Sequence, residues 1–135
     1  MLRVLIIEDD FILAEEWKQA LIKTKDYSVN LVKTGSEALA SIDIEMPDIM
    51  VVDLYHKNVY GSLNSDNGIR IMGPLKRSNP KIKMIAVTAY NNNKRTIGTE
   101  TVVFNLGADY FLSKPFDTSQ LLEKVQEAKA SIDLE

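Results

Sequence analysis

Residues 4–10 have the sequence VLIIEDD, in which a continuous apolar run ends in three carboxylates. Residues 49–53, IMVVD, repeat the arrangement and end in a single aspartate. Short apolar runs rich in β-branched residues are typical of parallel strands that are covered on both faces. Each stretch is therefore predicted to be a buried strand with acidic side chains at its carboxyl end.

Short strand-like segments alternate along the chain with segments that have a helical spacing of apolar residues. The strands are predicted at Arg3–Ile7, Ser28–Val32, Asp48–Val52, Lys83–Val87 and Asp109–Leu112. The second of these alternates between apolar and polar residues, as an edge strand does. Because right-handed crossovers place helices on both faces of a parallel sheet, we expect a doubly wound α/β sandwich with a five-stranded parallel sheet of order 2-1-3-4-5, the flavodoxin-like arrangement.

Apolar stripes and capping residues indicate where helices lie. The stripes consist of Leu13, Trp17 and Leu21 in one segment and of Leu121, Val125, Ala128 and Ile132 in another. This spacing gives a helix one apolar face, which is expected to pack on the sheet. Ser36 is predicted to cap a helix over Glu37–Ile42, and Asp117 or Thr118 is predicted to cap the last helix.

Composition limits the classes of function. The chain has 135 residues, 45% of them hydrophobic, and is expected to form one domain over residues 1–135. A net charge of −3 gives no broad basic field for direct binding of nucleic acid or a membrane surface. The absence of cysteine excludes disulfides, zinc-thiolate sites and a cysteine nucleophile. No apolar run approaches the roughly 20 residues that span a bilayer, so we expect a soluble protein. The absence of cysteine fits a reducing compartment, and we expect the protein to be cytoplasmic.

The acidic residues after the first and third predicted strands are expected to meet. Those two strands are neighbours in the order 2-1-3-4-5, so residues 8–10 and Asp53 would lie together at the carboxyl edge of the sheet. Carboxylates this close resist common ionisation unless a cation joins them. Hard oxygen ligands favour Mg²⁺, with Mn²⁺ as an alternative.

Two further polar side chains follow the fourth and fifth predicted strands. Thr88 offers a hydroxyl and Lys114 an ammonium group at the same edge of the sheet. A cation and a lysine can neutralise phosphoryl oxygens, a hydroxyl can donate a hydrogen bond to them, and a carboxylate can attack phosphorus. The edge is therefore predicted to carry out phosphoryl transfer to Asp53.

Four stretches of sequence lie at the ends of the first, third, fourth and fifth predicted strands. They are VLIIEDD at residues 4–10, VVDL at 51–54, VTA at 87–89 and GADYFLSKPF at 107–116. On these motifs the chain resembles the receiver domains of response regulators over almost its whole length. The resemblance implies a phosphorylation-dependent switch of two-component signalling that is not a conventional enzyme, although it promotes its own phosphorylation and dephosphorylation.

The resemblance also implies a role for each site residue. Glu8 and Asp9 correspond to the acidic pair that binds Mg²⁺, and Asp53 corresponds to the phosphoacceptor and a further metal ligand. The backbone carbonyl of Tyr55 corresponds to another metal ligand. Asp10 is then expected only to begin the first helix.

The remaining roles concern the response to phosphorylation. Thr88 and Lys114 correspond to the residues that hold the phosphoryl group, and Phe111 to an aromatic switch that turns inward when Thr88 moves. The face formed by helix four, strand five and helix five would then change shape. The implied donor is a sensor histidine kinase or a histidine phosphotransfer protein. The implied receiver of the signal is a downstream protein, a second copy of the chain or an effector domain outside this sequence.

Long polar loops distinguish this chain from the usual receiver pattern. Residues 54–67 and 89–98 follow strand ends, and a position where receivers commonly have proline holds Lys57. Such loops are expected to frame the site or contact its partners, although tolerated surface insertions are the alternative. The single histidine, His56, is expected to face solvent, because a lone histidine lacks companion nitrogen ligands.

Other interpretations of the site use the same residues. A structural interpretation makes Asp53 a buried or capping aspartate, Glu8 and Asp9 a helix start, Thr88 a cap and Lys114 a solvated base. Phosphatases with an aspartyl-phosphate intermediate usually have a second aspartate where this chain has Tyr55, so we expect a persistent acyl phosphate. A pseudo-receiver that binds partners without being phosphorylated is the third alternative.

Overall fold

A parallel sheet forms the centre of the protein. The computed structural model describes residues 1–54, 69–89 and 107–134. The strands are β1 (Leu2–Ile7), β2 (Tyr27–Val32), β3 (Ile49–Asp53), β4 (Lys83–Ala89) and β5 (Tyr110–Lys114). They are all parallel and lie in the order β2-β1-β3-β4-β5. The predicted flavodoxin-like sheet is confirmed.

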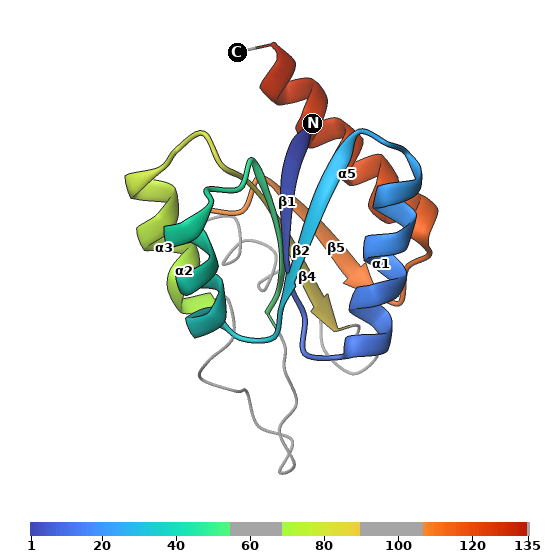
Figure 1. Cartoon of the computed structure of the whole chain (residues 1–135), viewed down its shortest axis with the longest axis horizontal. Coiled ribbons are helices and arrows are strands. Elements are labelled where there is room, and N and C mark those ends of the chain that lie inside the picture. Colours follow the sequence, from blue (N-terminus) through green and yellow to red (C-terminus); the bar gives the residue numbers. More distant parts are fainter. Residues whose placement is uncertain (55–68, 90–106, 135) are drawn as a thin grey trace.

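Helices cover both faces of this sheet. They are α1 (Phe11–Lys23), α2 (Gly35–Ile44), α3 (Ile69–Ser78) and α5 (Thr118–Asp133). Figure 1 shows α2 and α3 on one side of the sheet and α1 and α5 on the other, with the start of β1 and the end of α5 at the amino edge of the strands. Among the described residues, none of the helices is both long and apolar enough to cross a membrane.

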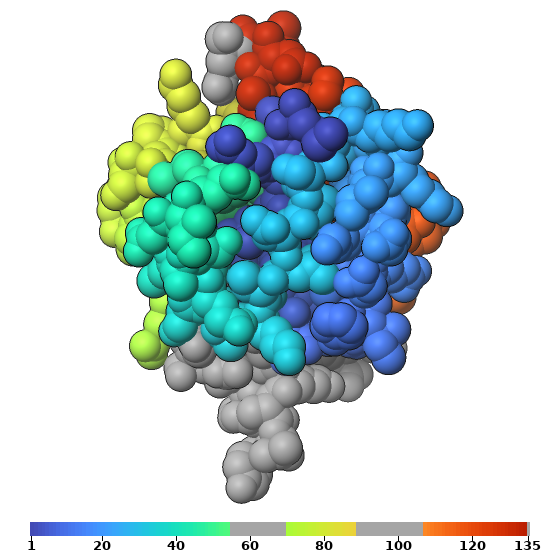
Figure 2. All heavy atoms as spheres, viewed as in Figure 1, coloured from blue at the N-terminus to red at the C-terminus, as the bar shows by residue number. Residues whose placement is uncertain are grey.

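The continuous apolar runs are explained by burial on two faces. In β1, Leu5 and Ile7 pack toward α2 and α3, whereas Val4 and Ile6 pack toward α1 and α5. β3 alternates in the same way. The edge strand β2 instead exposes Ser28 as its alternation predicts, and in Figure 2 it lies between the atoms of α2 and those of α1. The sheet therefore separates two apolar cores.

Two predicted strand starts lie just outside the strands. Asp48 precedes β3 and accepts a hydrogen bond from the Arg3 backbone N–H at 2.8 Å. Asp109 precedes β5 and accepts one from the Met84 backbone N–H, also at 2.8 Å. Lys76 of α3 forms an ion pair with Asp109 at 2.7 Å. Both strands start one residue later than predicted, and at both positions the aspartate side chain accepts a backbone N–H of the neighbouring strand.

Side chains at the helix starts confirm some predicted caps and correct another. Asp10 caps α1 by accepting the Leu13 N–H at 3.1 Å, and Asp117 rather than Thr118 caps α5. The prediction that Ser36 caps the second helix was wrong. Thr34 caps it, since α2 already begins at Gly35 and the Thr34 hydroxyl accepts the backbone N–H three residues later.

The Thr34 cap is a testable contribution to stability. Its hydroxyl accepts the Glu37 N–H at 3.1 Å, and the Glu37 carboxylate accepts the Thr34 N–H at 3.1 Å, which completes a capping box. Thr34→Ala is expected to lower the free energy of unfolding by about 1 kcal/mol, measured by urea denaturation. Thr34→Ser, which keeps the hydroxyl, is the control and should lose much less; equal losses would contradict the capping role.

Candidate functional site

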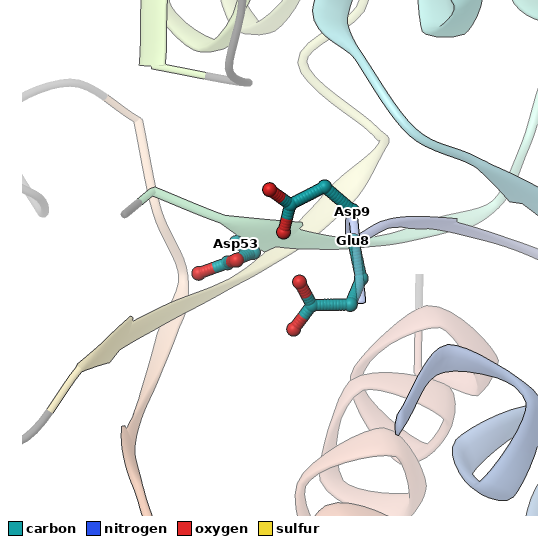
Figure 3. A group of neighbouring side chains, drawn as sticks. All are labelled: Glu8, Asp9 and Asp53. Carbon is teal, nitrogen blue, oxygen red and sulfur yellow. The ribbon is translucent and has the colours of Figure 1, made fainter. Parts of the chain in front are cut away.

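Three carboxylates meet at the carboxyl edge of the sheet. Strands β1 and β3 are adjacent, with Ile7 opposite Val52, so Glu8 follows one strand beside Asp53 at the end of the other. Carboxylate oxygens of Glu8, Asp9 and Asp53 all lie within 4.8 Å of one another. Figure 3 shows the three groups facing a common space. The structure thus brings together Glu8, Asp9 and Asp53 as predicted, whereas Asp10 caps α1 instead.

Two of these carboxylates are removed from water. Glu8 is 2% exposed and Asp53 is 1% exposed, whereas Asp9 is exposed. Buried like charges repel strongly because little solvent screens them. An all-oxygen donor set with excess negative charge is the chemistry that a hard divalent cation such as Mg²⁺ requires, so the residues present fit the predicted metal.

Lys114 partly compensates this negative charge. Its side chain extends from the end of β5, across β4, to the acidic residues after β1 and β3. The ammonium nitrogen lies 2.5 Å from Glu8 Oε1 and 3.5 Å from Asp53 Oδ2. Lys114 therefore lies closer to Glu8 than to Asp53.

The pKa values of the pair shift in ways that follow from this packing. Burial raises the pKa of the Glu8 carboxyl, and its contact with Asp53 raises it further, which together outweigh the lowering effect of Lys114. Burial lowers the pKa of the Lys114 ammonium, but its hydrogen bond to Glu8 and the charges of Asp53 and Glu8 outweigh burial and raise it. Lys114 is therefore a permanent cation at neutral pH.

Thr88 contributes a buried hydroxyl next to the acidic residues. Asp53 pairs with Val87 of β4, and Thr88 is the next residue along that strand. Thr88 is 6% exposed, and within the described part of the chain its Oγ1 has no hydrogen-bond partner. A buried hydroxyl without a partner costs free energy, and it can donate to an oxygen that enters the site.

Comparison with known proteins supplies the family. Residues 4–126 match the family described as the response regulator receiver domain. The chain belongs to this family. Receiver domains of response regulators act in two-component signalling, and this one has the acidic cluster through which such domains bind Mg²⁺.

Individual relatives agree with this assignment. The receiver domain is 27% identical over 126 residues to the response regulator MprA of Mycobacterium avium, covering 93% of this chain and 50% of that protein. It is 26% identical over 125 residues to the transcriptional regulatory protein DltR of Streptococcus agalactiae, again covering 93% of this chain and 50% of the relative. The chain thus spans about half the length of these curated relatives.

Solved structures show the same fold. A CheY-like receiver domain protein from Methanospirillum hungatei is 27% identical, with a TM-score of 0.80 and coverage of 98% of this chain and 97% of that chain. The signal receiver domain of a putative LuxO repressor protein from Vibrio parahaemolyticus is 25% identical, also with a TM-score of 0.80, and the match covers 98% of this chain and 93% of that chain. The fold of this receiver domain is therefore shared over nearly its full length.

The predicted switch residue lies on the side of the sheet that faces α2 and α3. Phe111 of β5 pairs with Ala86, and its half-buried side chain packs against the apolar core on that side.

Several predictions for this receiver domain concern residues outside the described ranges. Tyr55, whose carbonyl was predicted to bind the metal, is one of them, and so are His56 and Lys57. Most of the loops at 54–67 and 89–98 and the position of a fourth helix also lie outside these ranges.

One neighbour of the site was recognised from the sequence only as a core residue. Trp17 of α1 is 2% exposed, and the Lys114 nitrogen lies 5.7 Å from the centroid of its ring. The Phe116 ring stacks against Trp17 with a centroid separation of 5.2 Å and an interplanar angle of 26°. The only sequence signals were a tryptophan in the apolar stripe of the first helix and an aromatic residue two positions after the site lysine.

Proposed function

We propose that this receiver domain is a phosphorylation-dependent switch in which Asp53 accepts a phosphoryl group in a Mg²⁺-dependent reaction. The observation that supports this most strongly is the convergence of three carboxylates within 4.8 Å with the Lys114 ammonium, which lies 3.5 Å from Asp53. The donor would be a phosphohistidine of a sensor histidine kinase or of a histidine phosphotransfer protein. The domain would comprise residues 1–135 and act in the cytoplasm.

The transfer can be written as a balanced displacement. A carboxylate oxygen of Asp53 forms a bond to phosphorus while the bond between phosphorus and the donor imidazole nitrogen breaks. The imidazole leaves with that electron pair and takes up a proton from solvent, and Asp53 becomes an acyl phosphate. In this proposal, Lys114 pairs with a phosphoryl oxygen and the Thr88 hydroxyl donates a hydrogen bond to another.

The acidic residues would hold the metal during this step. Glu8, Asp9 and Asp53 would bind Mg²⁺, or Mn²⁺ in its place, together with the carbonyl of Tyr55. Bound Mg²⁺ would offset the negative charge of the phosphoryl oxygens and of the carboxylates around them. The protein's own contribution is to keep Asp53 buried and beside a fixed cation.

The response would begin at Thr88. Its buried hydroxyl lacks a partner among the described residues, so a phosphoryl oxygen offers a hydrogen bond that the resting site does not provide. Movement of Thr88 toward the site would leave space behind it for Phe111. A partner would read the resulting change on the face that includes β5 and α5.

The named relatives bear on the class of partner that would read this face. DltR is named a transcriptional regulatory protein, and both named relatives are about twice as long as their match to this chain. We propose that the output is a downstream protein, an effector domain outside this sequence or a second copy of the chain. We do not expect residues 1–135 to contact nucleic acid or a membrane directly.

Phosphoryl gain and its metal dependence test the function directly. The chain is incubated with Mg²⁺ and acetyl phosphate as a small donor, and its intact mass is followed with time. One phosphoryl group should be gained, and removal of Mg²⁺ with EDTA should prevent the gain because the crowded carboxylates then repel the anionic donor. No gain, while calorimetry shows that Mg²⁺ binds, would support a pseudo-receiver instead.

A further inference from the structure

The Lys114 side chain must be held in place by more than the two carboxylates. It crosses β4 to reach them. The lysine side chain has a flexible four-carbon stem, which by itself does not fix the position of the ammonium group. Its side chain is only 24% exposed, so most of this stem is packed against protein. Among the described residues, its ammonium group contacts Glu8, Asp53 and the Trp17 ring.

These contacts differ in how they respond to activation. In the proposed function, Glu8 binds the metal and Asp53 becomes an acyl phosphate, so both carboxylates that contact Lys114 change their charge or their partner. The Trp17 ring is uncharged, so its attraction for the ammonium group does not depend on the charge of the carboxylates. A cation within about 6 Å of an indole face is attracted by the ring quadrupole, and 5.7 Å lies inside this limit.

The ring itself is held firmly. Trp17 is 2% exposed in the core between the sheet and the helices α1 and α5. Phe116, two residues after Lys114, stacks on it at 5.2 Å. The indole is thus fixed from α1 and from the segment that follows β5, and it lies beside the ammonium group that it attracts.

We propose that Trp17 is a positioning residue for Lys114: its indole face keeps the ammonium group at the acceptor site while the surrounding carboxylates change charge. This inference rests on the proposed function and names a residue that acts through Lys114 without touching the phosphoryl group.

Three variants separate positioning from packing. Trp17→Leu removes the aromatic face but keeps an apolar side chain, and Trp17→Phe keeps a ring. Leu21→Ala is the matched control, since Leu21 is fully buried one helical turn away in the same core. The rate of phosphoryl gain from acetyl phosphate with Mg²⁺ is measured for each folded variant by intact mass.

The expected result is a graded one. Trp17→Leu should slow phosphoryl gain by about tenfold, Trp17→Phe should retain most of the rate, and Leu21→Ala should remain within about twofold of the wild type. If Trp17→Leu is no slower than Leu21→Ala, the inference is overturned while the proposed function stands. A wild-type chain that gains no phosphoryl group would instead refute the proposed function.

A measurement on the unmodified chain keeps the inference open to test even if the variants fold poorly. Proton NMR of the Lys114 ε-methylene group, assigned by its disappearance in Lys114→Met, should show an upfield ring-current shift relative to the other lysines. This shift should remain when Mg²⁺ is added. A Lys114 signal at the position of exposed lysines would overturn the inference whatever the phosphorylation rates are.

Discussion

Asp53→Asn is expected to abolish phosphoryl gain and, in the absence of Mg²⁺, to make the protein more stable. The amide is not a nucleophile toward phosphorus, so no acyl phosphate can form. The same substitution removes one of two buried carboxylates that repel each other, while Lys114 keeps its 2.5 Å contact with Glu8. Urea denaturation in EDTA should show a gain on the order of 1 to 2 kcal/mol.

Asp9→Asn is the control for both effects. Asp9 belongs to the same cluster but is exposed, so loss of its charge should change stability much less. It should slow phosphoryl gain through weaker metal binding without removing the acceptor. Continued mass gain by Asp53→Asn would place the acceptor elsewhere, and a loss of stability in EDTA would show that the carboxylates do not repel as the structure implies.

Lys114→Met is expected to be strongly destabilising at neutral pH and to lose most phosphoryl gain. The Glu8 side chain is 0% exposed and Lys114 provides its ion pair, so the substitution leaves a buried carboxylate without a cation. Removing one partner of a buried pair typically costs about 3 kcal/mol or more. Lys124→Met is the control. Lys124 pairs with Glu127 at the surface at 3.5 Å, so this variant should lose little stability.

The loss in Lys114→Met should depend on pH. The pKa of Glu8 is already raised in the folded chain, chiefly by burial, and Lys114 opposes this rise. The pKa should therefore be higher still when Lys114 is replaced. A carboxyl with a raised folded pKa favours the folded state fully below its unfolded pKa, and this contribution disappears as pH rises through the folded value. The variant should therefore approach wild-type stability near pH 4 to 5 and fall behind it as the solution becomes neutral. A pH-independent difference in EDTA, measured by urea denaturation, would contradict this explanation.

The sheet could be predicted from sequence because its strands are buried on two faces. Continuous runs such as residues 4–7 and 49–52 have few other interpretations, and their alternation with helical stripes fixes the topology. The roles of the Asp48 and Asp109 side chains just before β3 and β5 could not be predicted, since each aspartate bonds to a strand that is distant in sequence. The cap at Thr34 was missed because Ser36 is an equally good capping residue by type, and only the start of α2 distinguishes them.

The candidate site was predictable for a different reason. Parallel strands bring their carboxyl ends to one edge, so the approach of Glu8, Asp9, Asp53, Thr88 and Lys114 follows from topology alone. Topology does not determine which carboxylate Lys114 binds more closely or which ring lies beside it. Those contacts depend on side-chain rotamers and on packing between α1 and the end of β5, which are properties of the tertiary structure.

The two edges of the sheet differ in how fully their polar groups are satisfied. At the amino edge, Asp48 and Asp109 each bind a neighbouring strand, and Lys76 joins α3 to this network. At the carboxyl edge, two buried carboxylates repel each other and, among the described residues, the Thr88 hydroxyl lacks a partner. Local conflicts of this kind, called frustration, are tolerated where the rest of a fold is consistent. The contacts at the amino edge involve none of the site residues, so a ligand that relieved the frustration of the carboxyl edge would leave them intact.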